Sequence, residues 1–104
     1  MYDRDYSGTP LGKKLGAEPG VEVTVFFTTR RAELERRLPL LRDTMNRADG
    51  LWVAWPKKAT GLDTDLDFAS VQRTGLANGL VDNKSASIDD CWQAVRFVYR
   101  LSDR

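Results

Sequence analysis

Two stretches of the chain place consecutive apolar residues on both faces of a predicted strand, the first of them from Val25 to Phe27. This is the pattern of strands covered on both faces. The first, residues 21–27, reads VEVTVFF and runs from Val21 to Phe27. The second, residues 51–55, reads LWVAW and includes Trp52 and Trp55. A strand that buries only one face would alternate apolar and polar residues. We therefore expect two buried strands, with both tryptophans in the core rather than on a binding platform.

The segment between these strands has apolar residues at helical spacing, and so does the segment after the second strand. The first helical face is interrupted by Pro39, which predicts a kink or two abutting helices. Beyond residue 61, Thr64 and Asp67 have the spacing of a capping box, and Phe68 and Val71 begin another apolar face. Each strand is thus followed by a helix. The apolar positions of the first helix are Leu34, Leu38, Leu41 and Met45.

The C-terminal part of the chain predicts two more strands joined by a tight turn. The strand candidates are residues 80–88 and 91–101, and only Asp89 and Asp90 separate them, so they should pair antiparallel. Strands joined by helices form right-handed units with a parallel sheet. The predicted fold is α/β, with a small Rossmann-like sheet of about four strands. It comprises two parallel βα units, an antiparallel C-terminal strand pair, and helices on both faces.

Length and composition favour a single domain. The chain has 104 residues, of which 41% are hydrophobic and 30% charged, as in an ordinary soluble globular domain. The segment SGTPLGKKLG at residues 7–16 predicts a short helix. Residues 1–20 are therefore interpreted as an N-terminal helical arm and residues 21–104 as one α/β domain. Such a short chain has a thin margin of stability, which association of two copies would widen.

The residue types that are missing argue against several kinds of chemistry. The sequence contains no histidine and one cysteine, which excludes a Ser-His-Asp hydrolase and argues against a zinc site. Cys91 begins an apolar strand and is interpreted as a buried structural residue. The chain begins without the apolar run of a signal peptide, and no window approaches about 18 apolar residues. We therefore expect a cytoplasmic protein without a membrane span.

The acidic residues between the predicted elements are given structural interpretations. Asp63, Asp65 and Asp67 have the opening spacing of a calcium loop but lack its later residues. Acids are favourable at a helix N-terminus, and we assign these three to that position. Asp89 and Asp90 are typical of a turn. The sequence therefore predicts neither a metal site nor a cofactor.

The best candidate site lies beyond the carboxyl ends of the two parallel strands, where ligands bind in α/β sheets. Hydroxyl and cationic side chains follow both strands, and such an edge suits an anion such as phosphate. The alternative is that the threonines cap helices and the cations are solvated surface residues. The candidate ligand-binding residues are Thr28, Thr29, Arg30, Arg31, Lys57, Lys58 and Thr60.

Four phrases of the sequence resemble an actinobacterial family, the domain of unknown function 3052. They are SGTPLGKKLG, TTRRAELERRLP, GLWVAWPKK and GLVDNK, and they follow the family's order. The resemblance implies the C-terminal half of a class I, Rossmann-like methyltransferase fold, whereas the family name implies no activity. The chain departs from the family after Gly20, where the first strand region is missing. It also contains no G-x-G-x-x-G cofactor loop.

Two classes of function fit these observations. The first is a non-catalytic, self-associating binding or regulatory module with an anion or phosphate site. The second is a small or degenerate methyltransferase-like enzyme acting on a phosphorylated or carboxylated metabolite. The lack of an evident general base and of a cofactor loop favours the first. A net charge of +1 argues against nucleic-acid and membrane partners.

The predicted partner is a second copy of the chain. Relative to the resembling fold, the missing region leaves the strand at residues 21–27 on the edge of the sheet. Residues 23–27 contain no lysine, proline or inward charge that would protect such an edge. Natural proteins rarely leave an edge of this kind unpaired. We therefore expect a homodimer in which the two copies pair this strand antiparallel about a two-fold axis.

Overall fold

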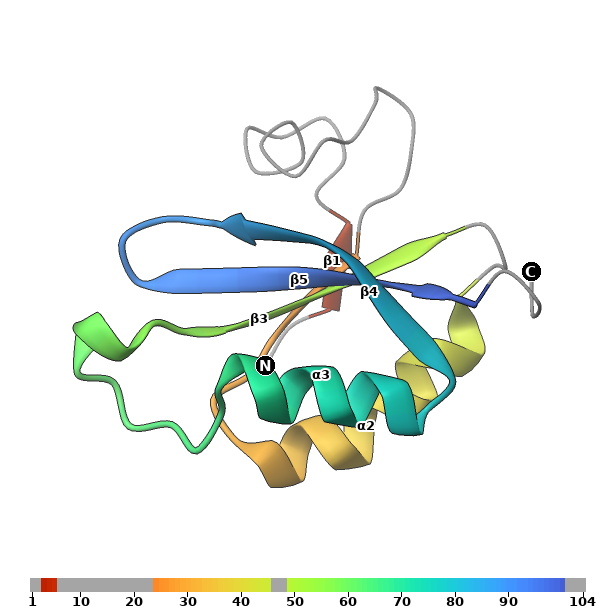
Figure 1. Ribbon diagram of the computed structural model, residues 1–104, viewed down its shortest axis with the longest axis horizontal. Helices are drawn as coiled ribbons and strands as arrows, with labels where there is room; N and C mark the ends of the chain where they lie inside the picture. Colours follow the sequence, from red (N-terminus) through yellow and green to blue (C-terminus); the bar gives the residue numbers. More distant parts are fainter. Residues whose placement is uncertain (1–2, 6–23, 46–48, 101–104) are drawn as a thin grey trace.

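The computed structural model describes residues 3–5, 24–45 and 49–100, and these residues form a mixed sheet with two α-helices (Figure 1). The α/β class is confirmed. The predicted helix at residues 7–16 lies outside the described residues. In chain order the elements are β1 Asp3–Asp5, β2 Thr24–Phe27, α2 Arg31–Thr44, β3 Gly50–Pro56, the 3-10 turn η1 Lys58–Thr60, α3 Phe68–Ala77, β4 Leu80–Ser87 and β5 Trp92–Tyr99.

The strand order is β1-β2-β3-β5-β4, which corrects the predicted pairing. Among the strands of the described residues, β2 and β3 are the one pair in parallel, and β5 lies between β3 and β4, antiparallel to both. Of the two predicted parallel βα units, the first is confirmed by the parallel pairing of β2 with β3, whereas the strand after the second helix, β4, pairs with β5 and not with β3. The antiparallel pairing of the last two strands is confirmed. The residue types explain this order. Strand β5 buries side chains on both faces and suits the interior, whereas β4 is polar and largely exposed, as an edge strand should be.

Both helices of the described chain lie on the same face of the sheet (Figure 1). Leu34 and Leu38 of α2 and Val71 of α3 pack into one core cluster with Val53 and Trp55 of β3. The prediction of helices on both faces is therefore wrong for the described residues. The predicted apolar face of α2 is confirmed, and Val71 of α3 is buried as predicted, but both helices cover the same layer of strand side chains.

The opposite face of the sheet has a second apolar cluster, formed by strand residues. Trp52 is 3% exposed there, and it lies with Val25, Ala54 and Ala94. Phe27 and Trp92 meet edge to face beside this cluster, with ring centroids 5.2 Å apart. Strand β3 thus buries Trp55 and Trp52 on opposite faces, as its uninterrupted apolar run predicted.

The first helix runs through its proline. Helix α2 is continuous from Arg31 to Thr44 with Pro39 inside it, so the alternative of two abutting helices is wrong. Leu34 and Leu38 are fully buried, and Leu41 and Met45 pack against the same cluster. The packing of this face against the sheet offsets the backbone hydrogen bond that a proline removes.

The second helix begins three residues later than predicted. Its N-cap is Asp67, whose carboxylate accepts a hydrogen bond from the Ser70 backbone N–H at 2.8 Å, while the Ser70 hydroxyl accepts one from the Asp67 N–H at 3.0 Å. The assignment of Thr64 as the cap is therefore wrong. Farther along α3, a Cβ added to Gly75 would lie 2.1 Å from the Phe97 ring. A glycine at this position lets the helix approach β5 closely.

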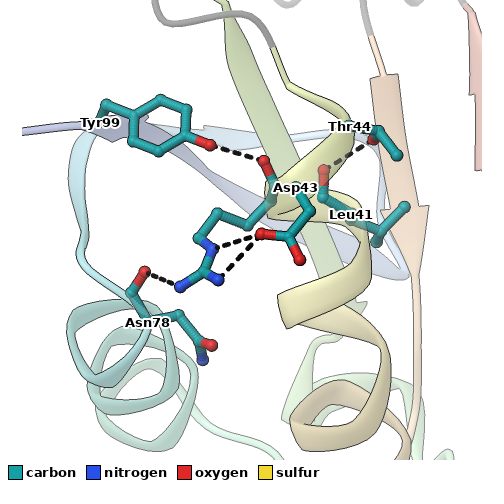
Figure 2. Close-up of polar contacts among 6 residues, drawn as sticks. Leu41, Asp43, Thr44, Asn78 and Tyr99 are labelled. Carbon is teal, nitrogen blue, oxygen red and sulfur yellow. Dashed lines mark hydrogen bonds and ion pairs between the residues drawn. The ribbon is translucent and has the colours of Figure 1, made fainter. Parts of the chain in front are cut away.

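A hydrogen-bonded group joins the ends of three elements (Figure 2). Arg42, in the last turn of α2, donates to the carbonyl oxygen of Asn78 beyond the end of α3, at 3.0 Å. The Tyr99 hydroxyl of β5 donates to the carbonyl oxygen of Arg42, at 2.6 Å. Asp43 accepts two further hydrogen bonds from the same guanidinium. A cation is favourable where helix carbonyl groups end. This group fixes the end of the molecule that is remote from the N-terminus of α3.

Strand β2 is not an edge in this structure. Strand β1 pairs with it antiparallel, placing Asp3, Arg4 and Asp5 opposite Phe26, Val25 and Thr24. The premise of the predicted dimer, an uncovered strand 21–27, is therefore wrong for Thr24–Phe27. Asp3–Asp5 form a strand rather than part of a helical arm. Among the described residues, no helix is long and apolar enough to cross a membrane.

Candidate functional site at the carboxyl end of β3

The carboxyl end of β2 is closed by internal hydrogen bonds. Thr28 is fully buried, and its backbone N–H donates to the Ala54 carbonyl oxygen at 3.0 Å. Its hydroxyl donates to Glu33 Oε1 at 2.6 Å, which ties the end of the strand to the first turn of α2. This threonine was predicted to bind a ligand. Its hydroxyl instead connects a strand to the helix that follows.

The loop before α3 supplies carboxylates to the same end of β2. Asp65 Oδ1 accepts a hydrogen bond from the Arg31 backbone N–H at 2.7 Å, and the Thr64 hydroxyl donates to the Thr29 carbonyl oxygen at 2.7 Å. Arg30 and Asp63 form an exposed ion pair at 2.6 Å. Asp63 and Asp65 were predicted to lie at the N-terminus of the helix that follows them, α3. They lie instead at the N-terminus of α2.

The Arg30–Asp63 pair shifts both titrations. The hydrogen bond from Arg30, assisted by its charge, lowers the pKa of the Asp63 carboxyl below its ordinary value. The same hydrogen bond and the charge of Asp63 raise the pKa of the Arg30 guanidinium. Both side chains are well exposed, so the pair contributes little net stability in water. Its effect is to neutralise the cation that follows β2.

The carboxyl end of β3 is tied to the turn between β4 and β5. The Lys57 backbone N–H donates to the Cys91 carbonyl oxygen at 2.8 Å, and the Lys57 ammonium donates to the Ser87 hydroxyl. The Thr60 hydroxyl donates back to the Lys57 carbonyl oxygen at 2.9 Å. Thr60 therefore closes the short η1 turn. Lys58 at the start of η1 has an exposed side chain.

A cleft of about 470 Å³ opens between this strand end and the start of α3. A second cavity of about 330 Å³ adjoins it on the side of β4 and β5, and the two cavities share Trp55, Lys57, Phe68 and Gln93. The larger cleft is lined by Trp55, Pro56, Lys57, Lys58, Leu66, Asp67, Phe68, Ala69 and Gln93.

Of the nine residues that line the cleft, only Lys57 and Lys58 were predicted to belong to a site, and two of the others, Phe68 and Gln93, bear on what the cleft can bind. Phe68 is 45% exposed at the first position of α3, and its ring centroid lies 6.4 Å from that of the buried Trp55. The expectation that Phe68 starts the buried face of α3 is wrong, because Val71 is the first residue of that helix in the core cluster. Gln93 lies opposite Trp55 in the ladder between β3 and β5. The sequence signal that could have indicated Gln93 as a site residue is a polar side chain among the apolar positions of β5.

Asp67 gives the cleft one negative charge. The backbone hydrogen bond from Ser70 is the main cause that lowers the pKa of the Asp67 carboxyl, and the charges of Arg31 and Lys58 lower it further. The carboxylate is thus ionised at neutral pH and committed to the N-terminus of α3. Since Arg31 and Lys58 both act on it, the two predicted clusters are neighbours on one edge, as expected, but they have different partners.

The turn beyond this edge corrects the interpretation of Cys91. Cys91 is exposed, because it lies in the turn before β5 and not inside the strand. Asp89 Oδ1 accepts hydrogen bonds from the backbone N–H groups of Cys91 and Trp92, at 2.7 and 2.9 Å. The turn chemistry assigned to Asp89 is therefore confirmed. In the described part of the chain, no three metal-ligating side chains gather into a group.

Comparisons with known proteins supply no template for this site. No protein-family model matches the chain, and no curated protein and no solved structure match it. The resemblance of four phrases to a family of unknown function therefore stays a prediction. What the cleft can do has to be argued from its own residues. These are two cations, one committed carboxylate, an amide and an exposed aromatic ring.

Proposed function

We propose that the chain is a non-catalytic binding module that holds a small anion, such as a phosphorylated metabolite, in the cleft at the carboxyl end of β3. The observation that carries this proposal is that two consecutive lysines, Lys57 and Lys58, line one wall of a cleft of about 470 Å³. Ammonium groups at the mouth of a partly apolar cleft attract and orient an anion more strongly than they do on a flat, fully solvated surface.

The chemistry of the cleft favours binding over catalysis. The sequence has no histidine, and the carboxylate of Asp67 is already bound to the N-terminus of α3. A catalytic base works best with a pKa near the operating pH, whereas the hydrogen bond from Ser70 lowers the pKa of the Asp67 carboxyl below its ordinary value. The methyltransferase-like enzyme remains the alternative, because the chain order from β2 to β5 is the order that the family resemblance implies.

Inorganic phosphate tests the proposed function. We expect isothermal titration of the full chain to detect binding, and the double substitution Lys57→Ala with Lys58→Ala to abolish it. The matched control is Lys84→Ala, which removes an exposed lysine from β4. Neither change should alter the free energy of unfolding by more than about 0.5 kcal/mol per residue. A wild-type chain that releases no heat at millimolar phosphate would refute the proposal.

Self-association is the second part of the proposal, and β1 gives it a specific test. A second copy pairing with β2 would have to displace Asp3–Asp5, which pair with Thr24–Phe27. The double substitution Arg4→Pro with Asp5→Pro should weaken β1, because one of two consecutive strand residues directs its N–H at the neighbouring strand and proline has no N–H to donate. Sedimentation equilibrium should then show a larger dimer fraction than for the wild type. Monomers in both proteins at every concentration would contradict pairing through β2.

A further inference from the structure

The residues that line the cleft divide by element into a cationic group and a largely apolar group. Lys57 and Lys58 belong to the strand end, whereas Leu66, Phe68 and Ala69 belong to the segment that enters α3. A free inorganic anion would use only the cationic group. The apolar group needs a different occupant if the whole cleft is a binding site.

The apolar group is dominated by one aromatic ring. Phe68 keeps 45% of its surface exposed although it packs beside Trp55, which is 1% exposed. An aromatic ring on a buried support makes a rigid platform, and a second ring that lies against it gains both apolar burial and ring contact. Because the same two aromatic residues line both cavities, the platform also borders the smaller cavity.

The carboxylate of Asp67 fixes the direction in which a ligand can lie. It caps α3 through the Ser70 backbone N–H, so the N-terminus of that helix is already closed by a negative charge. An incoming anion is repelled from this side and attracted to the lysines. The anionic end of a ligand therefore belongs at β3, and its uncharged end belongs against Phe68.

Gln93 completes the description of the uncharged end. It is half-buried and lines both cavities, opposite Trp55 in the sheet. A primary amide offers two donors and one acceptor. It suits a ring that carries hydrogen-bonding atoms on its edge, because those atoms would lie beside the amide when the ring covers Phe68.

We propose that the ligand class of this cleft is a planar aromatic or heteroaromatic compound that carries a phosphate or carboxylate group. Its ring packs on the exposed face of Phe68, which rests against the buried Trp55. Its polar ring edge meets Gln93, and its anionic group binds Lys57 and Lys58. This assignment rests on the proposed anion-binding function and adds the apolar half of the ligand.

The test compares phenyl phosphate with inorganic phosphate, using the full chain and isothermal titration. We expect phenyl phosphate to bind about tenfold more tightly, the size of effect that one ring contact together with its burial provides. Phe68→Ala should remove this advantage while leaving the affinity for inorganic phosphate unchanged. Leu76→Ala is the matched control, because it truncates another exposed apolar residue of α3, 41% exposed and outside the cleft.

The outcomes separate the two proposals. If inorganic phosphate binds and phenyl phosphate binds no more tightly, the ring assignment is wrong and the anion site stands. If neither probe binds, both proposals are wrong. If the advantage persists in Phe68→Ala, the ring lies elsewhere and the assignment is wrong. Phe68→Leu, which keeps apolar bulk without a ring, should lose most of the advantage and guards against a folding defect in Phe68→Ala.

Discussion

At the carboxyl end of β2, the Thr28 hydroxyl, the Arg30 guanidinium and the Arg31 backbone N–H have partners within the chain, whereas at the end of β3 two lysines border an open cleft. The difference comes from a single loop, because Asp63 and Asp65 reach Arg30 and the Arg31 backbone N–H. After β3, the Lys57 ammonium donates to the Ser87 hydroxyl, and Lys58 acts on the Asp67 carboxylate together with Arg31. Equal residue chemistry at two strand ends therefore produced one closed end and one open end.

The comparison shows what an internal carboxylate does to a potential ligand site. The Arg31 N–H belongs to the first turn of α2, where an external anion would be favoured by the helix dipole. Asp65 belongs to the same chain and accepts the hydrogen bond from that N–H, so the N–H is not available to an external anion. These internal hydrogen bonds fix the end of β2 and close it to an external ligand. The end of β3 keeps access, and the proposed function is assigned to it for that reason.

Trp55 is the residue whose loss should have the largest effect, because it supports the open end and also fills the core. It is 1% exposed and belongs to the cluster that both helices cover. Trp55→Ala should lower the free energy of unfolding by roughly 3 to 5 kcal/mol. Urea unfolding followed by circular dichroism measures this. A variant with wild-type stability and no ligand affinity would show that Trp55 is only a platform.

Asp65→Ala should have the next largest effect, because it removes the carboxylate that closes α2. Loss of a capping acceptor costs about 1 kcal/mol, and Arg30, at the N-cap position, forms no side-chain cap to replace it. Thermal unfolding of the variant measures the change. Asp90→Ala, in the exposed turn before β5, is the control and should leave the melting temperature unchanged. Equal effects would mean that the closed end adds no order.

Acid should weaken both ends through Asp63 and Asp67, whose folded pKa values are lowered below the ordinary 3.8. A carboxyl with a lowered folded pKa contributes stability that is present above its unfolded pKa and is lost as pH falls through the folded pKa. The free energy of unfolding should therefore decline as pH falls below about 4. Asp63→Asn should make that decline shallower, measured by urea unfolding between neutral and acid pH. An unchanged slope would contradict the ion pair.

The smallest expected effect is a second, weak anion site. Asp63→Asn combined with Asp65→Asn should remove the internal anions from the end of β2 while keeping the size of the side chains. Phosphate should then bind to Arg30 and the N-terminus of α2 in addition to the cleft. Isothermal titration should show the stoichiometry rise from one to two. An unchanged stoichiometry would mean that the internal carboxylates are not what closes this end.

Local patterns predicted the parts of the fold and the site that depend on neighbours in sequence. The run around Trp52 and Trp55 indicated a strand buried on both faces, and the hydroxyl and cationic groups after each strand were correctly placed on one edge. The turn role of Asp89 also follows from its immediate neighbours. In each case the residues that determine the structure are close neighbours in the sequence.

The remaining features depend on pairings between distant segments. Arg30 and Asp63 are 33 positions apart, and nothing in the residues 63–67 alone shows which helix their carboxylates will cap. Asp67 competes for the same role as Thr64 and succeeds because Ser70 completes the reciprocal hydrogen bonds. The exposure of Phe68 likewise depends on where α3 starts, which a capping pattern places only within a few residues.

The position of β5 has a consequence for synthesis of the chain. This strand is the last of the described elements to be made, yet it lies between β3 and β4, which precede it. While the ribosome still holds residues 92–99, β3 has β2 on one side only and β4 has no neighbour. The nascent chain therefore exposes one edge of β3 and both edges of β4 until β5 emerges, and this interval is when chaperones or aggregation would act on it.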